Sequence, residues 1–465
     1  MINKFYQKVL ISGLSLMLIL PLDVDAFAKA RPTVYATEDI GAGKTKKVNT
    51  ESITKIWYRP RANKREYQRE KLSGKNKTYN GKRIIISEKG KHYEFKRFAF
   101  LADGKPKKMK YYKTGILKKN SEVQGVAIIG KNSKAKMYIL VTNRRSGKNT
   151  NHRYGHILKY NLHTLNKYVN KKGKHDKIVR ALVKSRKYMY TTSASKSKKK
   201  HLRNKAKDKL TPTNYKIYRS VTIGPRFKAG HGQSFAYNPY DKYLYNAAYW
   251  LKKDTGKKHL VTMQRIGLNK LKPVKRWKFY IRIKKKAWHQ IWGVKFRWPF
   301  QDKNAGYLQI RDLTFDKNGN FYFAKLLGRN KLKKRKRLAI VKPNKHESKY
   351  ANQMGKKVQV YRGRLSSHSV KISAVHQISN SIGSVSQGLS YRKKGNRLFF
   401  IYDSAFMSLP LSKINQKFSR KSMHFTVLTR QYYRESEGMG ITSDGDGYLI
   451  MNRYAEAVKS VGKVR

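Results

Sequence analysis

The 465-residue sequence contains no cysteine. The chain therefore forms no disulfide bonds, offers no thiolate for nucleophilic catalysis and supplies no cysteine ligands to a metal. Acidic residues are also scarce, because 25 Asp and Glu stand against 108 Lys and Arg. Acid–base catalysis by paired carboxylates needs two acidic side chains close together, and this composition leaves few candidate pairs.

Short catalytic motifs are missing as well. The chain has no G-x-S-x-G, no H-E-x-x-H and no Gly-rich phosphate-binding loop. The turns FDKNGNFYF (315–323) and TSDGDGYLI (442–450) suggest calcium loops, but neither has the late bidentate Glu that such a loop needs. We therefore expect turn chemistry at these positions, with no metal site and no cofactor.

Long hydrophobic runs are absent after the N-terminus. The run VLISGLSLMLILPL (9–22) follows Lys4 and Lys8 and precedes the small-residue stretch DVDAFAKA (23–30). These are the three parts of a secretory signal peptide, and we predict it over residues 1–26, with cleavage after Ala26 or Ala30. A membrane anchor is the alternative, but a spanning helix needs about 20 apolar residues. We expect a secreted, extracellular protein with no transmembrane segment in the mature chain, either released or retained on the cell wall by charge.

The charge that is present is overwhelmingly positive, with a formal net value of +83. Such a surface repels itself and attracts a strongly anionic partner. Nucleic acid, anionic lipid and cell-wall polyphosphate all qualify. The predicted export favours anionic cell-wall polymers or an anionic cell surface over any specific nucleic acid, and we expect a monomer.

Five segments share one pattern: a polar residue, then apolar residues at alternate positions, then a polar turn, then a second apolar run. They are 123–142, 230–249, 310–326, 386–403 and 436–453. Alternation, turn and second run together indicate a β-hairpin, and the turns KNGN, KKGN and DGDG suit tight hairpins. Further strands follow several hairpins, which is typical of a propeller repeat. We predict an all-β fold, a β-propeller of about five blades, with six or seven blades or a two-sheet β-sandwich as alternatives.

The uneven spacing of the five segments divides the chain. We expect a basic N-terminal region over 27–115 that contributes closing strands, such as SITKIWYRP (52–60) or GKRIIIS (81–87). The propeller then occupies 116–465, with a basic helical or mobile insertion over 166–212. Strand character should resume in PTNYKIYRSVTIG (212–224).

In a propeller, the first strands line the central channel, and the residues that lead into them gather at one end. The stretch GHGQSFAYNP (230–239) should lead into such a strand, with Phe235 and Tyr237 on one face. We predict a ligand-binding channel mouth formed by Gln124, His231, Gln233, Arg311, Asp312, Gln387 and Glu437. The alternative is that these side chains pair where blades meet, as buried polar groups must.

Two basic runs, KSKKKHLRNKAK (196–207) and NKLKKRKR (330–337), are dense enough to bind a polyanion by charge. The predicted polyanion-binding residues are Lys198, Lys199, Lys200, Lys333, Lys334, Arg335, Lys336 and Arg337. Aromatic and basic residues also alternate over 275–300, where four Trp either stack on a ligand or pack in the core.

The stretches GHGQSFAYNPYDKYLYNAAY (230–249) and LQIRDLTFDKNGNFYFAKL (308–326) resemble the helveticin-type class III bacteriocins of lactobacilli. The resemblance implies a secreted β-propeller-like antimicrobial protein or a non-lytic relative. The excess of lysine and the basic N-terminal region depart from that family and favour wall binding.

We therefore expect a cationic propeller that binds anionic, teichoic-acid-like wall polymers. The alternative is an extracellular hydrolase or lyase that acts on wall glycans with Glu437, Asp312 and His231, so whether the protein is an enzyme stays open.

Overall fold

The computed structural model describes eighteen ranges of the chain. They are residues 33–37, 84–88, 91–100, 121–131, 134–143, 154–168, 176–248, 260–284, 287–291, 294–298, 307–327, 357–366, 369–378, 386–402, 405–414, 424–428, 435–452 and 456–464. The predicted signal peptide, the expected strand at 52–60 and the basic run at 330–337 lie outside them.

The described strands form five antiparallel blades, and each blade leads outward from an innermost strand. The first blade contains β4 (Ser121–Ile129), β5 (Lys136–Asn143), β6 (Tyr154–Asn161) and β7 (Val221–Ile223), with β8 (Phe227–Lys228) also paired to β6. The second contains β9 (Phe235–Asn238), β10 (Tyr243–Ala248), β11 (Val261–Ile266) and β12 (Pro273–Lys284), with β15 (Tyr307–Leu308) also paired to β12.

The third blade contains β16 (Thr314–Phe315), β17 (Phe321–Leu327), β18 (Lys357–Leu365) and β19 (Val370–Ile378). The fourth contains β20 (Ser386–Arg392), β21 (Arg397–Tyr402), β22 (Ala405–Pro410) and β23 (His424–Leu428). The fifth contains β24 (Glu435–Ile441), β25 (Asp446–Asn452), β26 (Glu456–Lys463) and, from near the N-terminus, β3 (Lys91–Phe100).

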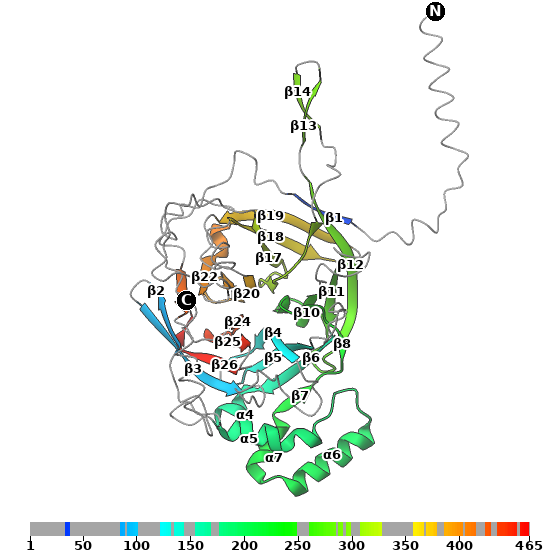
Figure 1. The fold of residues 1–465 in the computed structure, drawn as a ribbon, viewed down its shortest axis with the longest axis vertical. Coiled ribbons are helices and arrows are strands. Elements are labelled where there is room, and N and C mark those ends of the chain that lie inside the picture. The colour runs from blue at the N-terminus through cyan, green and yellow to red at the C-terminus, as the bar shows by residue number, and fades with distance from the viewer. Residues whose placement is uncertain are drawn as a thin grey trace, which may run out of the picture.

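The innermost strands close a ring. In chain order, β4 contacts β9, β9 contacts β16, β16 contacts β20 and β20 contacts β24, and β24 returns to β4. Figure 1 shows the blades arranged around a common centre. The protein is therefore a five-bladed β-propeller, which confirms the predicted fold and rules out the β-sandwich and the larger blade counts.

Strands from the N-terminal region tie neighbouring blades together. β1 (Thr33–Thr37) runs parallel to both β12 and β19 and so joins the second blade to the third. β2 (Ile84–Glu88) pairs with β3 and β23 and so joins the fifth blade to the fourth. A separate hairpin, β13 (Ala287–Ile291) and β14 (Val294–Trp298), projects away from the ring (Figure 1).

The core lies between the blades. Each of five hydrophobic clusters draws its residues from two blades that are neighbours in the ring. Phe235 of β9 packs with Leu140 of the first blade, whereas Ala236, one position on, packs with Phe315 of the third. The alternation along this strand thus buries both of its faces, one against each neighbouring blade.

The connection from β6 to β7 contains the predicted basic insertion, and it is helical. It forms α4 (Leu162–Asn166), α5 (Asp176–Ser185), the 3-10 turn η3 (Arg186–Tyr188), α6 (Lys196–Lys209) and α7 (Pro212–Arg219). A second short 3-10 turn, η4 (Leu411–Lys413), follows β22. The prediction of strand character from residue 212 was wrong over α7. Thr211 caps this helix and Pro212 occupies its first turn, a combination that starts helices rather than strands.

No helix among the described residues is long and apolar enough to cross a membrane.

Candidate functional site

The innermost strands begin with polar residues at one end of the ring, which we call the lead end. In β4, β20 and β24 the pairing register shifts at the lead residue, between Val123 and Gly125, Ser386 and Gly388, and Ser436 and Gly438. The shift is a β-bulge, which leaves one residue outside the ladder and redirects its side chain. The bulged residues are Gln124, Gln387 and Glu437, so a polar residue followed by glycine is the local signal for this geometry.

The second blade reaches the lead end through the stretch GHGQSFAYNP, which leads directly into β9. Gly230 and Gly232 have φ values of +66° and +94°, a conformation that glycine adopts most easily. A Cβ on Gly232 would lie 2.8 Å from Cγ2 of Thr142 and 3.1 Å from Cβ of Gln124. These glycines therefore let the backbone of the second blade pass close to the first.

Three of the predicted mouth residues meet at the lead end. The amide Nε2 of Gln233 donates to Oε1 of Gln387 and, at 3.1 Å, to Oε2 of Glu437. All three side chains are buried. Gln124 is also buried, and its Oε1 has no hydrogen-bond partner among the described residues. The cluster of Gln124, Gln233, Gln387 and Glu437 is called the axial cluster below.

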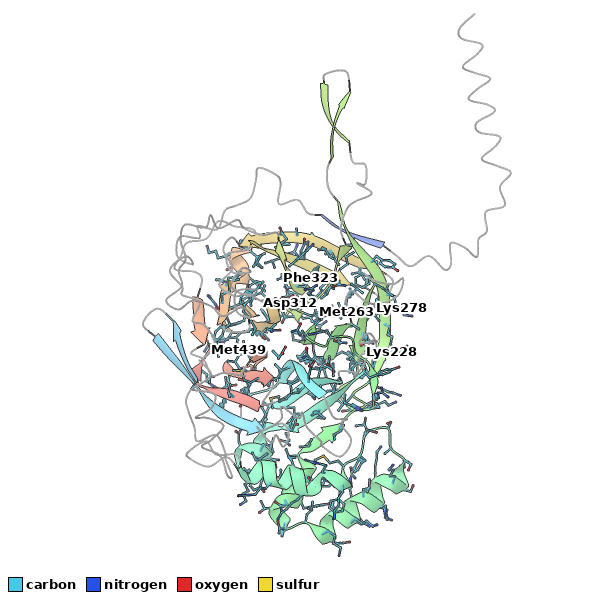
Figure 2. All side chains as sticks on the ribbon, in the orientation of Figure 1. Lys228, Met263, Lys278, Asp312, Phe323 and Met439 are labelled. Atoms are coloured by element: carbon cyan, nitrogen blue, oxygen red, sulfur yellow. The ribbon has the colours of Figure 1, made fainter. Side chains whose placement is uncertain are left out.

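Asp312 lies toward the middle of the ring (Figure 2), in the contact between the third and fourth blades. Its carboxylate is fully buried, accepting the Ala324 backbone N–H at 2.7 Å and the hydroxyl of Ser386. Burial raises the pKa of Asp312 to about 6, and these hydrogen bonds oppose the rise. The carboxylate therefore pairs blades, as the alternative interpretation of the mouth residues expected.

The remaining two mouth residues are less buried than the other five. Arg311 is exposed, and His231 is half-buried with its backbone carbonyl 3.4 Å from the hydroxyl of Thr142. The carboxyl groups of Asp312 and Glu437 have different hydrogen-bond partners. Ligand binding and catalysis by the mouth residues stay predictions.

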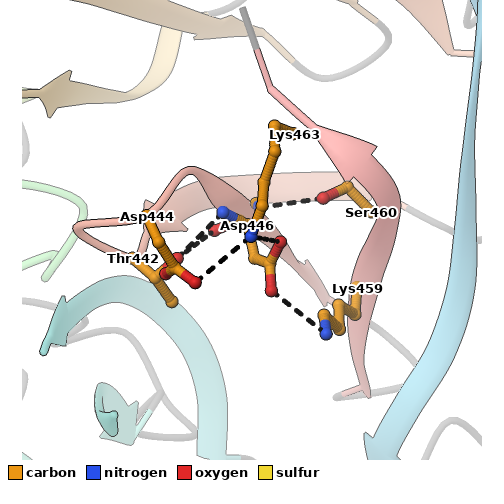
Figure 3. Close-up of polar contacts among 7 residues, drawn as sticks. Thr442, Asp444, Asp446, Lys459, Ser460 and Lys463 are labelled. Carbon is orange, nitrogen blue, oxygen red and sulfur yellow. Dashed lines mark hydrogen bonds and ion pairs between the residues drawn. The ribbon is translucent and has the colours of Figure 1, made fainter. Parts of the chain in front are cut away.

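The turn TSDGDG of the fifth blade uses its carboxylates in ion pairs (Figure 3). Asp446 pairs with Lys463 at 2.7 Å and with Lys459 at 3.1 Å, and Asp444 pairs with Lys463 at 3.2 Å. The Asp446 backbone N–H donates to the Thr442 hydroxyl at 2.8 Å, which closes the turn. Within the described part of the chain, no group of three or more His, Cys, Asp or Glu is placed to hold a metal ion.

The predicted polyanion-binding lysines that the structure describes lie on α6. Lys198 and Lys200 are exposed, while Lys199 is half-buried and its Nζ donates to the Thr192 carbonyl at 2.7 Å. Arg203, one turn on, lies against the ring of Tyr190 at 5.6 Å from the ring centre. A groove between α6 and α7 is lined by Lys196, Lys199, Lys200, Arg203, Asn204, Tyr215 and Arg219.

A second groove, which was not predicted from the sequence, lies between the second and third blades. It lies at the turn end of the ring, opposite the lead end, where β9 turns into β10 and β16 turns into β17. Tyr240 and Trp277 line it. Trp277 was considered either as a stacking residue or as a core residue, and in the structure it is half-buried against the core and open to this groove. Trp292, and the side chains of Trp288 and Trp298, lie outside the described residues.

Comparisons with solved structures find distant matches. Two structures of glucose dehydrogenase match with TM-scores of 0.30 and identities of 11% and 10%, over 73% and 74% of this chain and 83% of each of theirs. A functionally unknown protein from Desulfotomaculum acetoxidans matches with a TM-score of 0.28 and 9% identity, over 74% of this chain and 85% of that one. Similarity at this level carries no argument about activity. No family model matches the chain, and no curated protein matches it.

Proposed function

We propose that this protein is a secreted, cationic β-propeller that binds anionic cell-wall polymers of the teichoic-acid type. The observation that carries the proposal is the surface of α6. Of the fourteen residues in this helix, KSKKKHLRNKAKDK, Ala206 is the buried one. The predicted signal peptide and the resemblance to helveticin-type bacteriocins supply the extracellular setting, and a bacteriocin or a non-lytic relative fits the same role.

The cations of α6 repel one another along the helix. Lys196 and Lys200, Lys199 and Arg203, and Lys205 and Lys209 are each four residues apart, so each pair lies on one helix face. Like charges at this spacing destabilise a helix by about 0.2–0.5 kcal/mol per pair. Within the described part of the chain, no lysine of α6 forms an ion pair with a carboxylate. A bound polyanion would relieve this repulsion.

The groove between α6 and α7 suits a chain of phosphates. Lys199, Lys200 and Arg203 line one side of it, and Arg219 of α7 lines the other. Lysine acts on phosphate as a point charge, while the guanidinium of arginine donates two parallel hydrogen bonds to one phosphate. Because a phosphodiester polymer carries a charge at each repeat, its binding should release counterions and weaken steeply with salt.

The test compares two variants that remove the same charge. One changes Lys198, Lys199 and Lys200 of α6 to Gln, and the control changes Lys371, Lys393 and Lys394, exposed lysines of the third and fourth blades, to Gln. Binding to purified Gram-positive cell walls is measured over a salt series. We expect the slope of log affinity against log salt to become less negative by about 2–3 in the α6 variant, as three lost phosphate contacts require, and to change by less than about 1 in the control.

Circular dichroism checks that α6 remains helical, since the variant also removes the contact from Lys199 to Thr192. The proposal is overturned if both variants reduce the steepness of the salt dependence equally, because binding then follows net charge alone. It is also overturned if removal of teichoic acid from the walls leaves the affinity unchanged.

A further inference from the structure

We infer that the groove between the second and third blades binds a sugar unit that carries a phosphate group. The inference deepens the proposed function by naming the repeating unit of the polymer, and it rests on that proposal for the polymer being anionic. The groove measures about 410 Å³. Small-molecule sites are typically about 300–1,000 Å³, so it accommodates one or two sugar rings.

An exposed aromatic side chain forms one wall of the groove. Tyr240, in the turn between β9 and β10, is 65% exposed and is one of two large hydrophobic side chains with high exposure among the described residues. Its ring lies against Gly319 in the matching turn of the third blade, where an added Cβ would be 3.1 Å from the ring. The ring is therefore supported on one face by the neighbouring blade.

A second aromatic side chain is held in place nearby. The indole of Trp277 stacks on Tyr245 with 6.2 Å between ring centres, and its N–H donates to the Ser366 carbonyl at 3.0 Å. Two aromatic side chains around one groove suit a sugar, because the C–H face of a sugar ring stacks on aromatic rings. Both rings lose little conformational freedom when a ligand binds, since Trp277 is already packed and Tyr240 is supported by Gly319.

The charged residues of the groove favour an anion. Arg265, Lys275 and Arg364 line it together with one carboxylate, that of Asp241. Asp241 already accepts the hydroxyl of Tyr245 and, at 3.2 Å, the backbone N–H of Tyr243. The groove thus keeps an excess of positive charge.

Two of these cations lie beside aromatic rings. Lys275 Nζ is 5.0 Å from the ring centre of Trp277, and the guanidinium of Arg265 is 4.1 Å from that of Tyr243. The buried Nε–H of Arg265 has no acceptor among the described residues. A ligand that stacks on the aromatic wall can therefore also place a phosphate within reach of a cation. A neutral sugar lacks the charge contact, and a free phosphate lacks the stacking contact.

The groove lies on the same side of the ring as the helical connection of the first blade. Both the β6–β7 connection, which contains α6, and the β11–β12 connection leave their blades at the turn end. The two touch, since the hydroxyl of Thr192 donates to the Lys270 carbonyl at 2.7 Å. Lys270 and Lys272 are exposed beside this contact. One polymer chain can follow this basic surface from α6 to the groove.

The test measures small-ligand binding to the full chain by calorimetry in 1 M NaCl, where the Debye length is about 3 Å and diffuse attraction is screened. The probes are glucose, galactose and N-acetylglucosamine 1-phosphates, glycerol 3-phosphate, the corresponding neutral sugars, inorganic phosphate and AMP. We expect at least one sugar phosphate to bind more tightly than its neutral sugar and than phosphate. Tyr240→Ala, which changes no charge, should weaken that binding about tenfold, the loss of one stacking contact of ~1.4 kcal/mol.

Tyr154→Ala is the matched control, because it removes the same kind of side chain without changing charge, from β6 away from the groove, where Tyr154 lies against Arg226 at 3.9 Å. It should leave the affinity unchanged. The inference is overturned if no sugar phosphate binds, if Tyr154→Ala weakens binding as much as Tyr240→Ala, or if AMP binds more tightly than every sugar phosphate, which would indicate a nucleobase site.

The α6 variant separates this inference from the proposed function. If α6 carries the polymer charge, that variant weakens wall binding at low salt and leaves sugar-phosphate binding in 1 M NaCl intact. If the α6 variant does not weaken wall binding, while Tyr240-dependent sugar-phosphate binding is observed, the proposed function alone is overturned. If the α6 variant weakens wall binding as expected, but no Tyr240-dependent sugar-phosphate binding is observed, the inference about the groove alone is overturned.

Discussion

The amide Nε2 of Gln233 donates to Oε2 of Glu437 at 3.1 Å, and this bond joins the second blade to the fifth, which are not neighbours in the ring. The contact must therefore cross the axis of the propeller. The same amide also reaches Gln387 of the fourth blade. One side chain of the axial cluster, that of Gln233, thus links three of the five blades and helps to hold the lead end of the ring closed.

The bond from Gln233 to Glu437 predicts unequal effects of two substitutions. Gln233→Leu removes this donor from a buried carboxylate, and we expect the free energy of unfolding to fall by about 2–3 kcal/mol, the usual value for a hydrogen bond to a charged group. Glu437→Gln keeps an acceptor oxygen for Nε2 of Gln233 and should cost less than about 1 kcal/mol. Urea unfolding followed by tryptophan fluorescence measures both. Equal losses would mean that the bond is not what stabilises the lead end.

Burial of Asp312 predicts a stability that depends on pH. Its pKa is raised from 3.8 in the unfolded chain to about 6 in the fold, chiefly by desolvation. The folded state therefore holds the proton more tightly, so this group's contribution to stability falls as pH rises from 4 to 6 and stays low above that. The ionised carboxylate costs the fold up to roughly 3 kcal/mol at neutral pH.

Asp312→Asn should therefore raise the melting temperature at pH 7.5 and flatten its dependence on pH between 4 and 6. The amide can still accept from the Ala324 N–H and can donate to the Ser386 hydroxyl, so both hydrogen bonds persist. Asp208→Asn, on the exposed surface of α6, removes the same charge and serves as the control. A lower melting temperature for Asp312→Asn at pH 7.5 would show that the ionised form is the one that the fold requires.

The glycine at 232 predicts a local packing defect when it is replaced. Gly232→Ala combines a positive φ of +94° with a Cβ that would lie 2.8 Å from Thr142, so we expect a loss of about 2–4 kcal/mol. Gly395→Ala has a similar φ of +79° but nothing closer than 3.9 Å, and it should lose only the backbone part, about 1–2 kcal/mol. Thermal unfolding of the two variants separates crowding from backbone strain. Equal losses would show that the first and second blades can move apart at no cost.

Much of this architecture could be predicted from the sequence, because alternation and turn chemistry are local properties. Phe235 and Tyr237 share a face since they are two residues apart, and the polar residues that lead β4, β20 and β24 are visible from the same repeat. The partners could not be predicted. That Gln233 crosses to Gln387, or that Tyr240 rests on Gly319, depends on how blades meet, which no local pattern records. The helix α7 was missed because Tyr215 and Ile217 flank Lys216, an alternation that also suits a strand. Only the cap Thr211 and Pro212 distinguish the two.

The unpartnered amide of Gln124 gives the last prediction. A buried acceptor with no hydrogen bond costs about 1–3 kcal/mol, and methionine fills a similar volume without that cost. We therefore expect Gln124→Met to raise the free energy of unfolding of the ligand-free protein by about 1 kcal/mol. Gln387→Met is the matched control, because Oε1 of Gln387 accepts from Gln233 and its loss should destabilise the ring.

Chemical denaturation of both variants measures the two changes, which should have opposite signs. If Gln124→Met destabilises the protein as much as Gln387→Met does, then Oε1 of Gln124 has a partner on the axis in solution. That partner would be a water or a bound ligand, since Gln124 has none among the described residues. Equal destabilisation by the two variants would therefore support the predicted channel-mouth site. Changes of opposite sign favour an axial cluster whose role is to hold the blades together.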